Sequence, residues 1–302
     1  MTTNTLPPTI NLHSLVPCNY QCGFCYTGFA SAKRPKIPQL ELHEIIRQVA
    51  RAPKNFEDGS RKVTFVGGEP LLSPTVFEDI AFAREEGLVT SLVTNGSLLT
   101  GDKIRRLAPI LDWLTISIDS QSADTNLLIG RAARGVTIST ADYLDKIHSA
   151  QALGIKMKVN TVVNQANFTE DFTAFIRAAR PHRWKLFQAT RIAEENGGTF
   201  GRWAISEAVF REFIARHADL AREGVVIVPE TQAEMYGTYA MVGPNGCFFD
   251  NSAGTYRYSQ PIVKVGIEAA WAEIAFSEER FRARQGDYDF ATGLNRTLEV
   301  AR

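Results

Sequence analysis

The chain has 302 residues and carries 33 basic and 33 acidic side chains, so its formal net charge is zero. A neutral chain offers no overall basic field for DNA or RNA, and 44% hydrophobic content is enough for a buried core in one large or two small domains. The N-terminus lacks the features of a secretory signal and no apolar run approaches the roughly 20 residues that span a bilayer, so we expect a cytoplasmic protein that binds neither membrane nor nucleic acid.

Strand-like and helix-like segments alternate along the first part of the chain. Strands are predicted at 10–14, 62–66, 90–94, 113–118, 157–162 and 184–189. Helices are predicted at 41–52, 102–107, 141–153 and 170–178, and another is predicted to open with Ser73 as N-cap and Pro74 in the first turn. Repeated strand–helix steps of this kind indicate an α/β fold with a parallel sheet, here a partial (β/α)6 barrel.

The alternation of strands and helices changes after Ala189. Residues 190–201 are predicted as a loop, and 206–223 as one amphipathic helix that ends at Gly224 and includes His217 on its apolar stripe. We expect His217 to pack inside the protein rather than to act in catalysis, and the residues from Val225 onward to cap one end of the barrel. The expected organisation is a barrel over residues 1–190 and a C-terminal capping extension over 191–302, in one compact unit.

Side-chain parity along the strands predicts a polar barrel interior, because alternate residues of a strand share one face. The polar faces carry Asn11 and His13, Lys62 and Thr64, Thr115, Ser117 and Asp119, Lys158 and Asn160, and Arg183 and Lys185. An ordinary sheet with one solvated face is the alternative. Helices normally cover both faces of a parallel sheet, however, which favours the polar interior.

The predicted inward faces bring four cations together, those of Lys62, Lys158, Arg183 and Lys185. Because Lys and Arg suit phosphate oxygens, this grouping favours a polyanion such as a nucleoside triphosphate. The alternative is a set of separate surface salt bridges, which contribute little to stability.

Three of the four cysteines cluster in the segment CNYQCGFC, as Cys18, Cys22 and Cys25. Iron–sulfur cubanes are usually held by four Cys thiolates, so three leave one iron open to a small molecule. A zinc site completed by His13 or Cys247 is an alternative, although zinc sites prefer two paired groups of ligands. A disulfide framework is less consistent with so few cysteines in a chain of this length.

The CxxxCxxC spacing, with Phe24 before the last cysteine, resembles the signature of radical S-adenosylmethionine (SAM) enzymes. That resemblance implies a radical SAM barrel and a 4Fe–4S cluster on Cys18, Cys22 and Cys25, whose open iron binds the amino and carboxylate groups of SAM. In that superfamily an electron from the reduced cluster cleaves SAM, and the resulting 5′-deoxyadenosyl radical removes hydrogen from the substrate.

Further strings narrow the resemblance to the viperin family of radical SAM enzymes, over about residues 10–290. These strings are FVGGEP, LVTNGSL, ISIDS, LIGR, KVNTVVN, RWKLFQ, AEENGG and VPETQAEMYGTY, in the order and with roughly the spacing of that family. Val66 departs from the pattern, since animal viperins have Ser there. Their N-terminal amphipathic membrane helix is also absent, so we expect either a bacterial or archaeal member or a shortened chain.

The resemblance implies roles for the residues that match these motifs. The residues implied to bind the cofactors are Phe24, Gly67, Gly68, Glu69 and Pro70, with Asn95, Ser117 and Arg131 around the ribose and carboxylate of SAM. The residues implied to bind the triphosphate are Lys62, Lys158, Arg183 and Lys185, while Asn11, His13 and Asn160 would face the rest of the nucleotide. Tyr239 matches a tyrosine near the reacting sugar, and Glu230 belongs to the same cap.

Viperins convert a nucleoside triphosphate to its 3′-deoxy-3′,4′-didehydro analogue, and the resemblance implies this reaction, with CTP as the first candidate and UTP or GTP as others. Hydrogen would leave C4′, the 3′-hydroxyl would leave with a proton donor, and one electron would complete the alkene. Lys158 is a candidate proton donor as well as a phosphate ligand, and Tyr239 either donates hydrogen or packs on the sugar. The product would terminate phage polymerase chains. We expect a monomer that takes electrons from flavodoxin or ferredoxin.

Two other interpretations stay open. A radical SAM enzyme that acts on a peptide, or on GTP in molybdopterin synthesis, would carry further cysteines for auxiliary clusters, and only Cys247 lies downstream. In a non-enzymatic iron–sulfur sensor, the GGEP string and the cationic strand faces would have no function. We expect Cys247 to be a small buried residue rather than a ligand.

Overall fold

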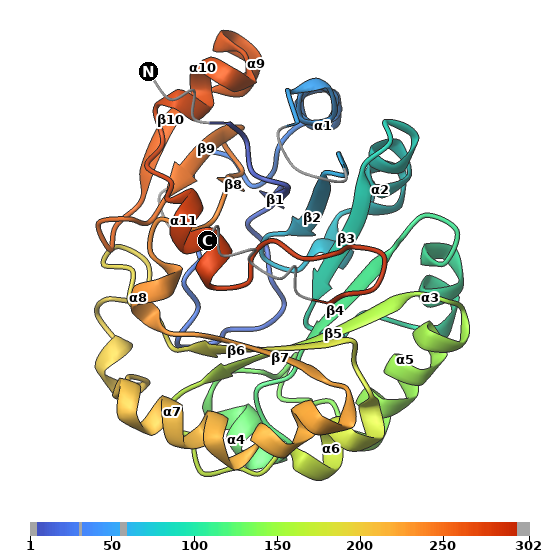
Figure 1. Cartoon of the computed structure of the whole chain (residues 1–302), viewed down its shortest axis with the longest axis vertical. Helices are drawn as coiled ribbons and strands as arrows, with labels where there is room; N and C mark the ends of the chain where they lie inside the picture. Colours follow the sequence, from blue (N-terminus) through green and yellow to red (C-terminus); the bar gives the residue numbers. More distant parts are fainter. Residues whose placement is uncertain (1–4, 30–31, 55–58, 295–302) are drawn as a thin grey trace, which may run out of the picture.

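A curved sheet of parallel strands forms the centre of the computed structural model, which describes residues 5–29, 32–54 and 59–294. The parallel strands, in chain order and in spatial order, are β1 (Thr9–His13), β2 (Lys62–Val66), β3 (Val89–Thr94), β4 (Trp113–Ser117), β5 (Lys156–Val163), β6 (Arg183–Gln188) and β7 (Val226–Glu230). Within the described residues the two edges of the sheet do not pair with each other. The α/β fold and the partial barrel predicted from the sequence are therefore confirmed (Figure 1).

Helices surround this sheet (Figure 1). They are α1 (Gln39–Arg51), α2 (Val76–Glu85), α3 (Gly101–Leu107), α4 (Ala123–Leu128), α5 (Thr140–Ala152), α6 (Thr173–Ala179) and α7 (Glu207–Arg216), with the 3-10 helices η1 (Pro70–Leu72), η2 (Phe200–Arg202) and η3 (Ala218–Glu223). In α1, Leu42, Ile45, Ile46 and Val49 recur at helical spacing and are buried in the main core. No helix of the described residues is long and apolar enough to cross a membrane.

The region after Ala189 contributes strands as well as a cap. β7 adds a parallel strand beside β6, and β8 (Met241–Val242), β9 (Cys247–Asp250) and β10 (Arg257–Pro261) extend the opposite edge beyond β1, giving a ten-stranded sheet. Short helices α8 (Gln232–Met235), α9 (Ile262–Val265), α10 (Ile267–Ala272) and α11 (Glu278–Ala283) connect and follow these strands. Six strands were predicted from the sequence, and β7 was missed. The β-branched run Val225–Val228 favours a strand, and Pro229 is tolerated because β7 lies at the edge of the sheet.

Two predicted helix boundaries are wrong. The helix predicted at 206–223 divides at His217. In an uninterrupted helix the backbone N–H of His217 would donate to the Phe213 carbonyl. Here Nδ1 of the His217 side chain forms a hydrogen bond with that carbonyl instead, at 2.8 Å. Nε2 of His217 accepts from the Phe172 N–H at 2.9 Å, which confirms the predicted packing role of this residue. The helix predicted to open at Ser73 begins at Val76, because Ser73 still belongs to the end of η1.

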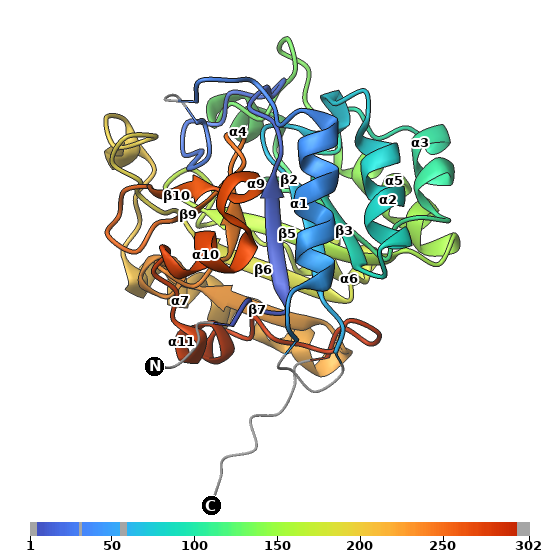
Figure 2. The same ribbon diagram turned by 90° about the horizontal axis from the view of Figure 1, so that it is seen from above.

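The segment that follows α11 crosses one end of the barrel, and the loop that follows β1 lies at the other end (Figure 2). Trp113, the first residue of β4, donates from Nε1 to the Phe290 carbonyl at 3.0 Å. Arg183, the first residue of β6, donates to the Gly293 carbonyl at 2.6 Å. The amino ends of the strands are thus closed by the C-terminal segment. The last eight residues of the predicted extension lie outside the described residues.

A buried arginine joins the end of α1 to the start of β2. The side chain of Arg61 is fully buried and donates to the backbone carbonyls of Val49, Ala52 and Pro53 at 2.7, 2.9 and 2.7 Å. These carbonyls belong to the last turn of α1 and the residues after it, which have no partner within the helix. Burial lowers the pKa of Arg61 to about 10, so the guanidinium remains charged at neutral pH.

Replacing Arg61 by Met should lower the free energy of unfolding by about 3 kcal/mol, because several buried carbonyls lose their hydrogen-bond donor. Urea denaturation followed by circular dichroism would measure the change. The matched control is Arg51→Met, at an exposed position of the same helix, where a change within about 0.5 kcal/mol is expected. Equal stability of the two variants would contradict the stabilising role of Arg61.

Candidate functional site

The polar side chains predicted to face inward meet in one cavity of about 300 Å³, a size at which small-molecule sites begin. Among the residues singled out in the sequence, those that line it are Asn11, His13, Cys18, Cys22, Phe24, Cys25, Lys62, Gly67, Gly68, Asn95, Ser117, Arg131, Lys158, Asn160, Arg183, Lys185 and Tyr239. Glu69, Pro70 and Glu230 are buried but do not line it. The polar interior predicted from strand parity is confirmed.

The cysteine loop, residues 18–25, is anchored to the segment that follows α4. Gln21 and Gly23 donate their N–H groups to the carbonyls of Gly130 and Ile129 at 3.0 and 3.1 Å. Within the loop, the Cys25 N–H donates to the Cys22 carbonyl at 3.0 Å. These backbone bonds fix the loop at the carboxyl end of the barrel, where active sites of such barrels are found.

The chemistry of the three thiols suits a multi-iron cluster. All three cysteines are free, and burial raises their pKa values, to about 12 for Cys22, so the thiols stay protonated until a metal displaces the proton. In the described part of the chain no three His, Cys, Asp or Glu side chains converge to hold a single metal ion. In a cubane each thiolate binds a different iron, so three thiols that do not converge on one point still fit.

The alternative zinc site is not supported by the geometry. Cys247 lies in β9, is buried, and does not line the cavity that holds the other three cysteines. His13 lines the cavity from β1, but its ring packs edge-on against Phe29 and Phe249, with centroids 5.5 and 5.4 Å away. The predicted character of Cys247, a small buried residue, is confirmed.

Gly68 passes directly against the start of the cysteine loop. A Cβ at this position would overlap the carbonyl oxygens of Val16 and Pro17, so only glycine permits the approach. The N–H groups of Gly68 and Glu69 donate to the carbonyls of Leu15 and Pro17 at 2.9 and 2.8 Å. The GGEP segment therefore sets the position of Cys18, the next residue along the loop.

Glu69 supports a lining residue rather than lining the cavity itself. Its carboxylate accepts from the Thr94 hydroxyl at 2.7 Å and from the Asn95 N–H at 2.8 Å. The Asn95 side chain in turn donates to the Asn19 side chain, in the cysteine loop, at 2.9 Å. Pro70 follows as the first residue of η1. Glu69 thus holds the carboxyl ends of β2 and β3 together beneath the cysteine loop.

Arg131 carries a buried positive charge to the cysteine loop. It pairs with Asp119 at 2.9 Å, donates to the Ser117 carbonyl, and lies 3.8 Å from the sulfur of Cys22. Burial alone would lower the pKa of Arg131, but attraction to Asp119 and Cys22 raises it, so the guanidinium stays charged. A fixed cation next to the thiols favours their deprotonated form and can also hold a carboxylate.

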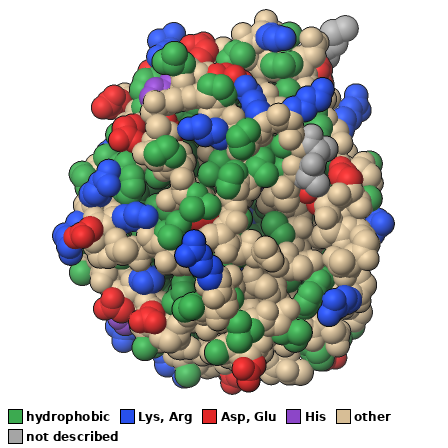
Figure 3. Space-filling view, turned by 180° about the vertical axis from the view of Figure 1, so that it is seen from behind, with side chains coloured by type: hydrophobic (Ala, Val, Ile, Leu, Met, Phe, Trp, Pro, Cys, Tyr) green, Lys and Arg blue, Asp and Glu red, His purple; other side chains and the backbone are tan. Residues whose placement is uncertain are grey.

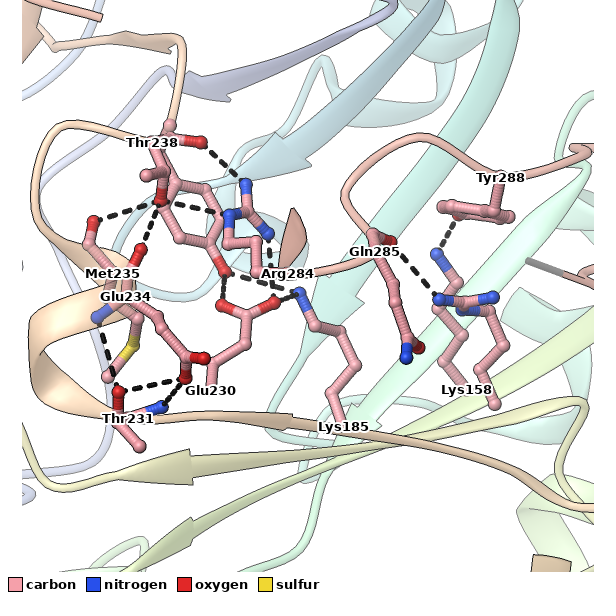
Figure 4. Close-up of polar contacts among 12 residues, drawn as sticks. Lys158, Lys185, Glu230, Thr231, Glu234, Met235, Thr238, Arg284, Gln285 and Tyr288 are labelled. Carbon is pink, nitrogen blue, oxygen red and sulfur yellow. Dashed lines mark hydrogen bonds and ion pairs between the residues drawn. The ribbon is translucent and has the colours of Figure 1, made fainter. Parts of the chain in front are cut away.

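The four predicted cations meet at the amino end of the barrel. Lys158 of β5 stands beside Arg183 of β6 in the sheet, and its amine contacts the hydroxyl of Tyr288 (Figure 4). The same hydroxyl also contacts the amine of Lys62. The guanidinium of Arg183 lies 4.1 Å from the centre of the Tyr288 ring. Burial and the neighbouring cations lower the pKa values of Lys62 and Lys158 well below the usual range. The cluster is therefore short of negative charge.

Lys185 differs from the other three cations because it has a carboxylate partner. Glu230 is fully buried and pairs with Lys185 and, at 2.9 Å, with Arg284, while the Tyr239 hydroxyl donates to the same carboxylate (Figure 4). Burial lowers the pKa of Lys185 to about 8 against the attraction of Glu230. Burial would raise the pKa of Glu230, but Arg284 and Lys185 lower it, so the carboxylate is ionised.

Sequence reasoning missed Arg284 and Tyr288, which come from the C-terminal segment. Arg284 also donates to the Thr238 carbonyl at 2.6 Å, and its guanidinium lies 3.9 Å from the centre of the Tyr239 ring. Neither residue lies on a predicted strand or in a recognised string, and the segment 278–290 has no periodicity that points to the cavity. Only the way the C-terminal segment folds across the barrel brings them there.

Two side chains that line the cavity carry polar atoms with no hydrogen-bond partner among the described residues. Both ring nitrogens of His13 and the side-chain oxygen of Asn160 are buried and unpaired. Burial lowers the pKa of His13 to about 3, so its imidazole is neutral and offers one donor and one acceptor. Because buried polar groups are rarely left unpaired, these two residues are suited to a polar ligand.

Comparison with known proteins gives a family and a set of relatives. Residues 16–179 match the Radical SAM superfamily. The chain is 38% identical over 297 residues to the S-adenosylmethionine-dependent nucleotide dehydratase of Lacinutrix mariniflava, covering 96% of this chain but only 60% of that protein. It is 37% identical over 292 residues to the protein of the same name from Flammeovirga pacifica, covering 95% of this chain and 97% of that protein. With S-adenosylmethionine-dependent nucleotide dehydratase RSAD2 of Danio rerio the identity is 33%, over 94% of this chain and 78% of that protein.

Solved structures share the fold at low sequence identity. The crystal structure of Streptococcus suis SuiB bound to its precursor peptide SuiA superposes with a TM-score of 0.70 at 16% identity, over 92% of this chain and 66% of that chain. The protein anSMEcpe with bound S-adenosylmethionine gives a TM-score of 0.60 at 15% identity, over 80% of this chain and 73% of that chain. These neighbours support the barrel fold and carry no statement about substrate.

Replacing Gly68 by Ala should displace the start of the cysteine loop, because the added Cβ meets backbone oxygens that cannot move aside cheaply. After anaerobic reconstitution with iron and sulfide, the variant should bind less than about half as much iron per chain as the wild type. Gly101→Ala is the matched control, since a Cβ there makes ordinary van der Waals contact. Unchanged iron content in Gly68→Ala would contradict the role given to this glycine.

Proposed function

Because the chain belongs to the radical SAM superfamily and, within it, to the family of SAM-dependent nucleotide dehydratases, we propose that it removes the 3′-hydroxyl of a nucleoside triphosphate as water. The product is the 3′-deoxy-3′,4′-didehydro nucleotide, with CTP as the first candidate substrate and UTP or GTP as the others. The observation that carries the proposal is the joint lining of one cavity by the three cysteines and the four cations. The enzyme is proposed to be a cytoplasmic monomer that makes chain terminators against phage.

The cysteine loop is proposed to hold a 4Fe–4S cluster through Cys18, Cys22 and Cys25. When bound and reduced, the cluster and SAM together supply the radical that removes hydrogen from the substrate. The chain contributes the charge and shape around these groups. Arg131 would bind the carboxylate of SAM, and Asn95 and Ser117 would contact its ribose. Gly67 and Gly68 would leave room for the amino group of SAM. Glu69 and Pro70 would hold this glycine segment in place.

The triphosphate is proposed to bind at the amino end of the barrel through Lys62, Lys158, Arg183 and Lys185. Phosphate oxygens would supply the negative charge that this buried cluster lacks and would raise the lowered lysine pKa values. They would compete with the Tyr288 hydroxyl for the amines of Lys62 and Lys158. Binding of the charged end here would place the ribose between the cations and the cysteine loop.

The sugar and base are proposed to contact the middle of the cavity. Asn11, His13 and Asn160 line this part, and the last two carry unpaired polar atoms suited to a hydroxyl or a base edge. Tyr239 donates to Glu230 and lines the cavity, so its phenol can stand next to the reacting sugar with a proton acceptor behind it. Lys158 is proposed as a phosphate ligand and as a candidate proton donor for the departing hydroxyl.

The other interpretations lack supporting features. An enzyme with auxiliary clusters needs further cysteines, and the one cysteine downstream, Cys247, is away from the cavity. A sensor that binds no substrate would not need a set of buried cations that repel one another, because burying each charge without an anion costs free energy. The electron donor is proposed to be a flavodoxin or ferredoxin, and no nucleic acid or membrane partner is proposed.

The reconstituted enzyme, incubated anaerobically with SAM and dithionite, should convert one nucleoside triphosphate to a product lighter by one water. Mass spectrometry after separate incubations with ATP, CTP, GTP and UTP measures both product and base preference. Formation of 5′-deoxyadenosine should rise with the same nucleotide. If none of the four yields the dehydrated product while the iron content is complete, the proposed reaction is wrong.

Nucleotide affinity should fall as pH rises above about 8, by up to about tenfold per pH unit for each proton taken up. The sign follows from Lys185, whose pKa is lowered to about 8 in the free protein and would be raised by the triphosphate, so that binding takes up a proton above that pH. Calorimetry at about pH 8.5 in two buffers of different ionisation enthalpy measures the uptake.

Lys185→Ala is the variant that tests this assignment. It should bind nucleotide more weakly and take up fewer protons, while keeping the iron content of the wild type. Proton release on binding, or affinity that does not change with pH, would argue against a triphosphate at these amines. Loss of iron in the variant would show that Lys185 is needed for folding instead.

A further inference from the structure

Glu230 is a buried carboxylate that is shared by two cations and one phenol. One of its oxygens accepts from Arg284 at 2.9 Å and also contacts the amine of Lys185. The other oxygen accepts from the hydroxyl of Tyr239 (Figure 4). Two positive charges therefore face one negative charge, and the group carries one surplus positive charge. Burying a surplus charge costs free energy unless an anion neutralises it.

Arg284 is the more firmly held of the two cations. Each of its three guanidinium nitrogens has a partner, because Nη1 donates to Glu230 while Nε and Nη2 donate to the hydroxyl and the carbonyl of Thr238, at 2.9 and 2.6 Å. The guanidinium also lies 3.9 Å from the centre of the Tyr239 ring. Its side chain is only 3% exposed. Arg284 is therefore fixed next to the phenol.

Lys185 is the more accessible cation. Its side chain is 17% exposed, and its amine contacts Glu230 and donates to the Tyr239 hydroxyl at 3.2 Å. An ammonium on a flexible stem can turn toward a new anion, whereas a guanidinium fixed by several hydrogen bonds must break them to do so. If a triphosphate binds in the cavity, Lys185 is thus the cation that is able to leave Glu230.

The path of the chain places Arg284 in the wall that closes the cavity. The carboxyl end of the barrel shows a hollow near the centre of its face (Figure 3). The segment that follows α11, which begins with Arg284, crosses the opposite end (Figure 2). Lys185 and Arg284 both line the cavity, but Arg284 reaches it from the closed end. This position suits a fixed counter-ion better than a mobile one.

We propose that Arg284 is a positioning residue, the permanent counter-ion that keeps Glu230 ionised when a triphosphate draws Lys185 away. Glu230 then continues to accept the hydrogen bond of Tyr239, so the phenol keeps its place in the free and in the bound protein. The proposal rests on the proposed function, because the triphosphate is the anion that would take Lys185. The charges support it, since the departure of Lys185 leaves a neutral pair behind.

Two more distant groups also sense the charge of Glu230. Burial lowers the pKa of Arg183, and the charge of Glu230 opposes this change. Burial raises the pKa of Tyr26, and the charge of Glu230 adds to the rise, so this phenol is neutral at neutral pH. Arg183 is itself proposed to bind the triphosphate. Once Arg183 and Lys185 serve the substrate, Arg284 is the cation that remains for Glu230.

Removal of Arg284 should make Glu230 take up a proton when nucleotide binds. In Arg284→Met, Lys185 still pairs with Glu230 in the free protein, and the triphosphate then removes this last neighbouring cation. A buried carboxylate without a cation has a raised pKa, because burial disfavours the charged form. A pKa that rises on binding means proton uptake, so the nucleotide affinity of this variant should fall more steeply than that of the wild type as pH rises through about 7.

Calorimetry measures this proton directly. CTP, or whichever of the other three triphosphates binds the wild type, is titrated into the iron-loaded protein without SAM or reductant, so that no turnover occurs. The titration is done at about pH 7 in two buffers of different ionisation enthalpy. Arg284→Met should take up about one more proton per nucleotide than the wild type. Because Lys62, Lys158 and Lys185 are present in both proteins, the difference reports on Glu230.

Three further variants control this result. Arg284→Lys keeps a cation and should take up protons as the wild type does. Glu230→Gln, added to Arg284→Met, removes the acid and should abolish the extra uptake. Arg282→Met is the matched control, at an exposed position of α11 that pairs with Glu278, and should behave as the wild type. Affinity that falls equally at every pH, with no extra proton, would identify a phosphate ligand or a purely structural residue and would overturn the proposal.

A second measurement needs no nucleotide and separates this proposal from the proposed function. Lys185→Ala imitates the state in which Lys185 has left Glu230. Infrared difference spectra, taken against the same variants with Glu230→Gln, show whether the buried carboxyl is ionised. At about pH 7 it should be ionised in Lys185→Ala and protonated once Arg284→Met is added. An ionised carboxyl in both would overturn the proposal.

The two measurements can fail independently. If the wild type binds none of the four triphosphates, the proposed function is wrong, and the infrared comparison still decides the role of Arg284. If the variant that lacks both Lys185 and Arg284 does not fold, which its melting curve would show, calorimetry on Arg284→Met decides it instead.

Discussion

A cluster of buried cations at the amino end of the barrel is the constraint on which the rest of this structure depends. Lys62 lies on β2, Lys158 on β5, and Arg183 and Lys185 on β6, and within the described residues Lys185 pairs with the carboxylate of Glu230. Burying unpaired charge costs several kcal/mol per ion, so the protein surrounds these groups with weaker partners. The ring and hydroxyl of Tyr288 and the carbonyl of Gly293 are such partners. The lowered pKa values of Lys62 and Lys158 express this cost, which a bound anion would relieve.

The barrel also fixes how far that anion lies from the cysteine loop. The loop is bound by backbone hydrogen bonds at the carboxyl ends of the strands, and the cations sit near the amino ends. Strands of about five residues span roughly 17 Å. This distance is closer to the length of an extended nucleotide than to that of a phosphate group alone. Between these ends lie His13 and Asn160 with unpaired polar atoms, and Tyr239 with its carboxylate partner. With charge at one end and the three thiols at the other, the part of the cavity between them is where the proposed function places the sugar.

Much of this arrangement could be predicted from the sequence, because period-two patterns decide which side chains share a face. The alternation of side chains along each strand was enough to place Lys62 of β2 and Lys185 of β6 in the same interior, and the cysteine spacing was enough to identify the loop. The parts that could not be predicted come from segments with no such period. Arg284 and Tyr288 reach the cavity only because the C-terminal segment crosses the barrel, and long-range chain paths of this kind leave no local signal. The break at His217 depends on a side chain competing for a helix carbonyl, which propensity cannot reveal.

The two ends of the barrel also separate the protein's electrostatic tasks. At the amino end, the buried cations would act on the proposed triphosphate through a low dielectric, where salt screens little. At the carboxyl end, Arg131 brings a separate buried positive charge to the cysteine loop and pairs with Asp119. The two ends of the barrel therefore do not compete for the same charges. A chain of zero net charge can carry both tasks because each depends on local charge held by fixed backbone contacts.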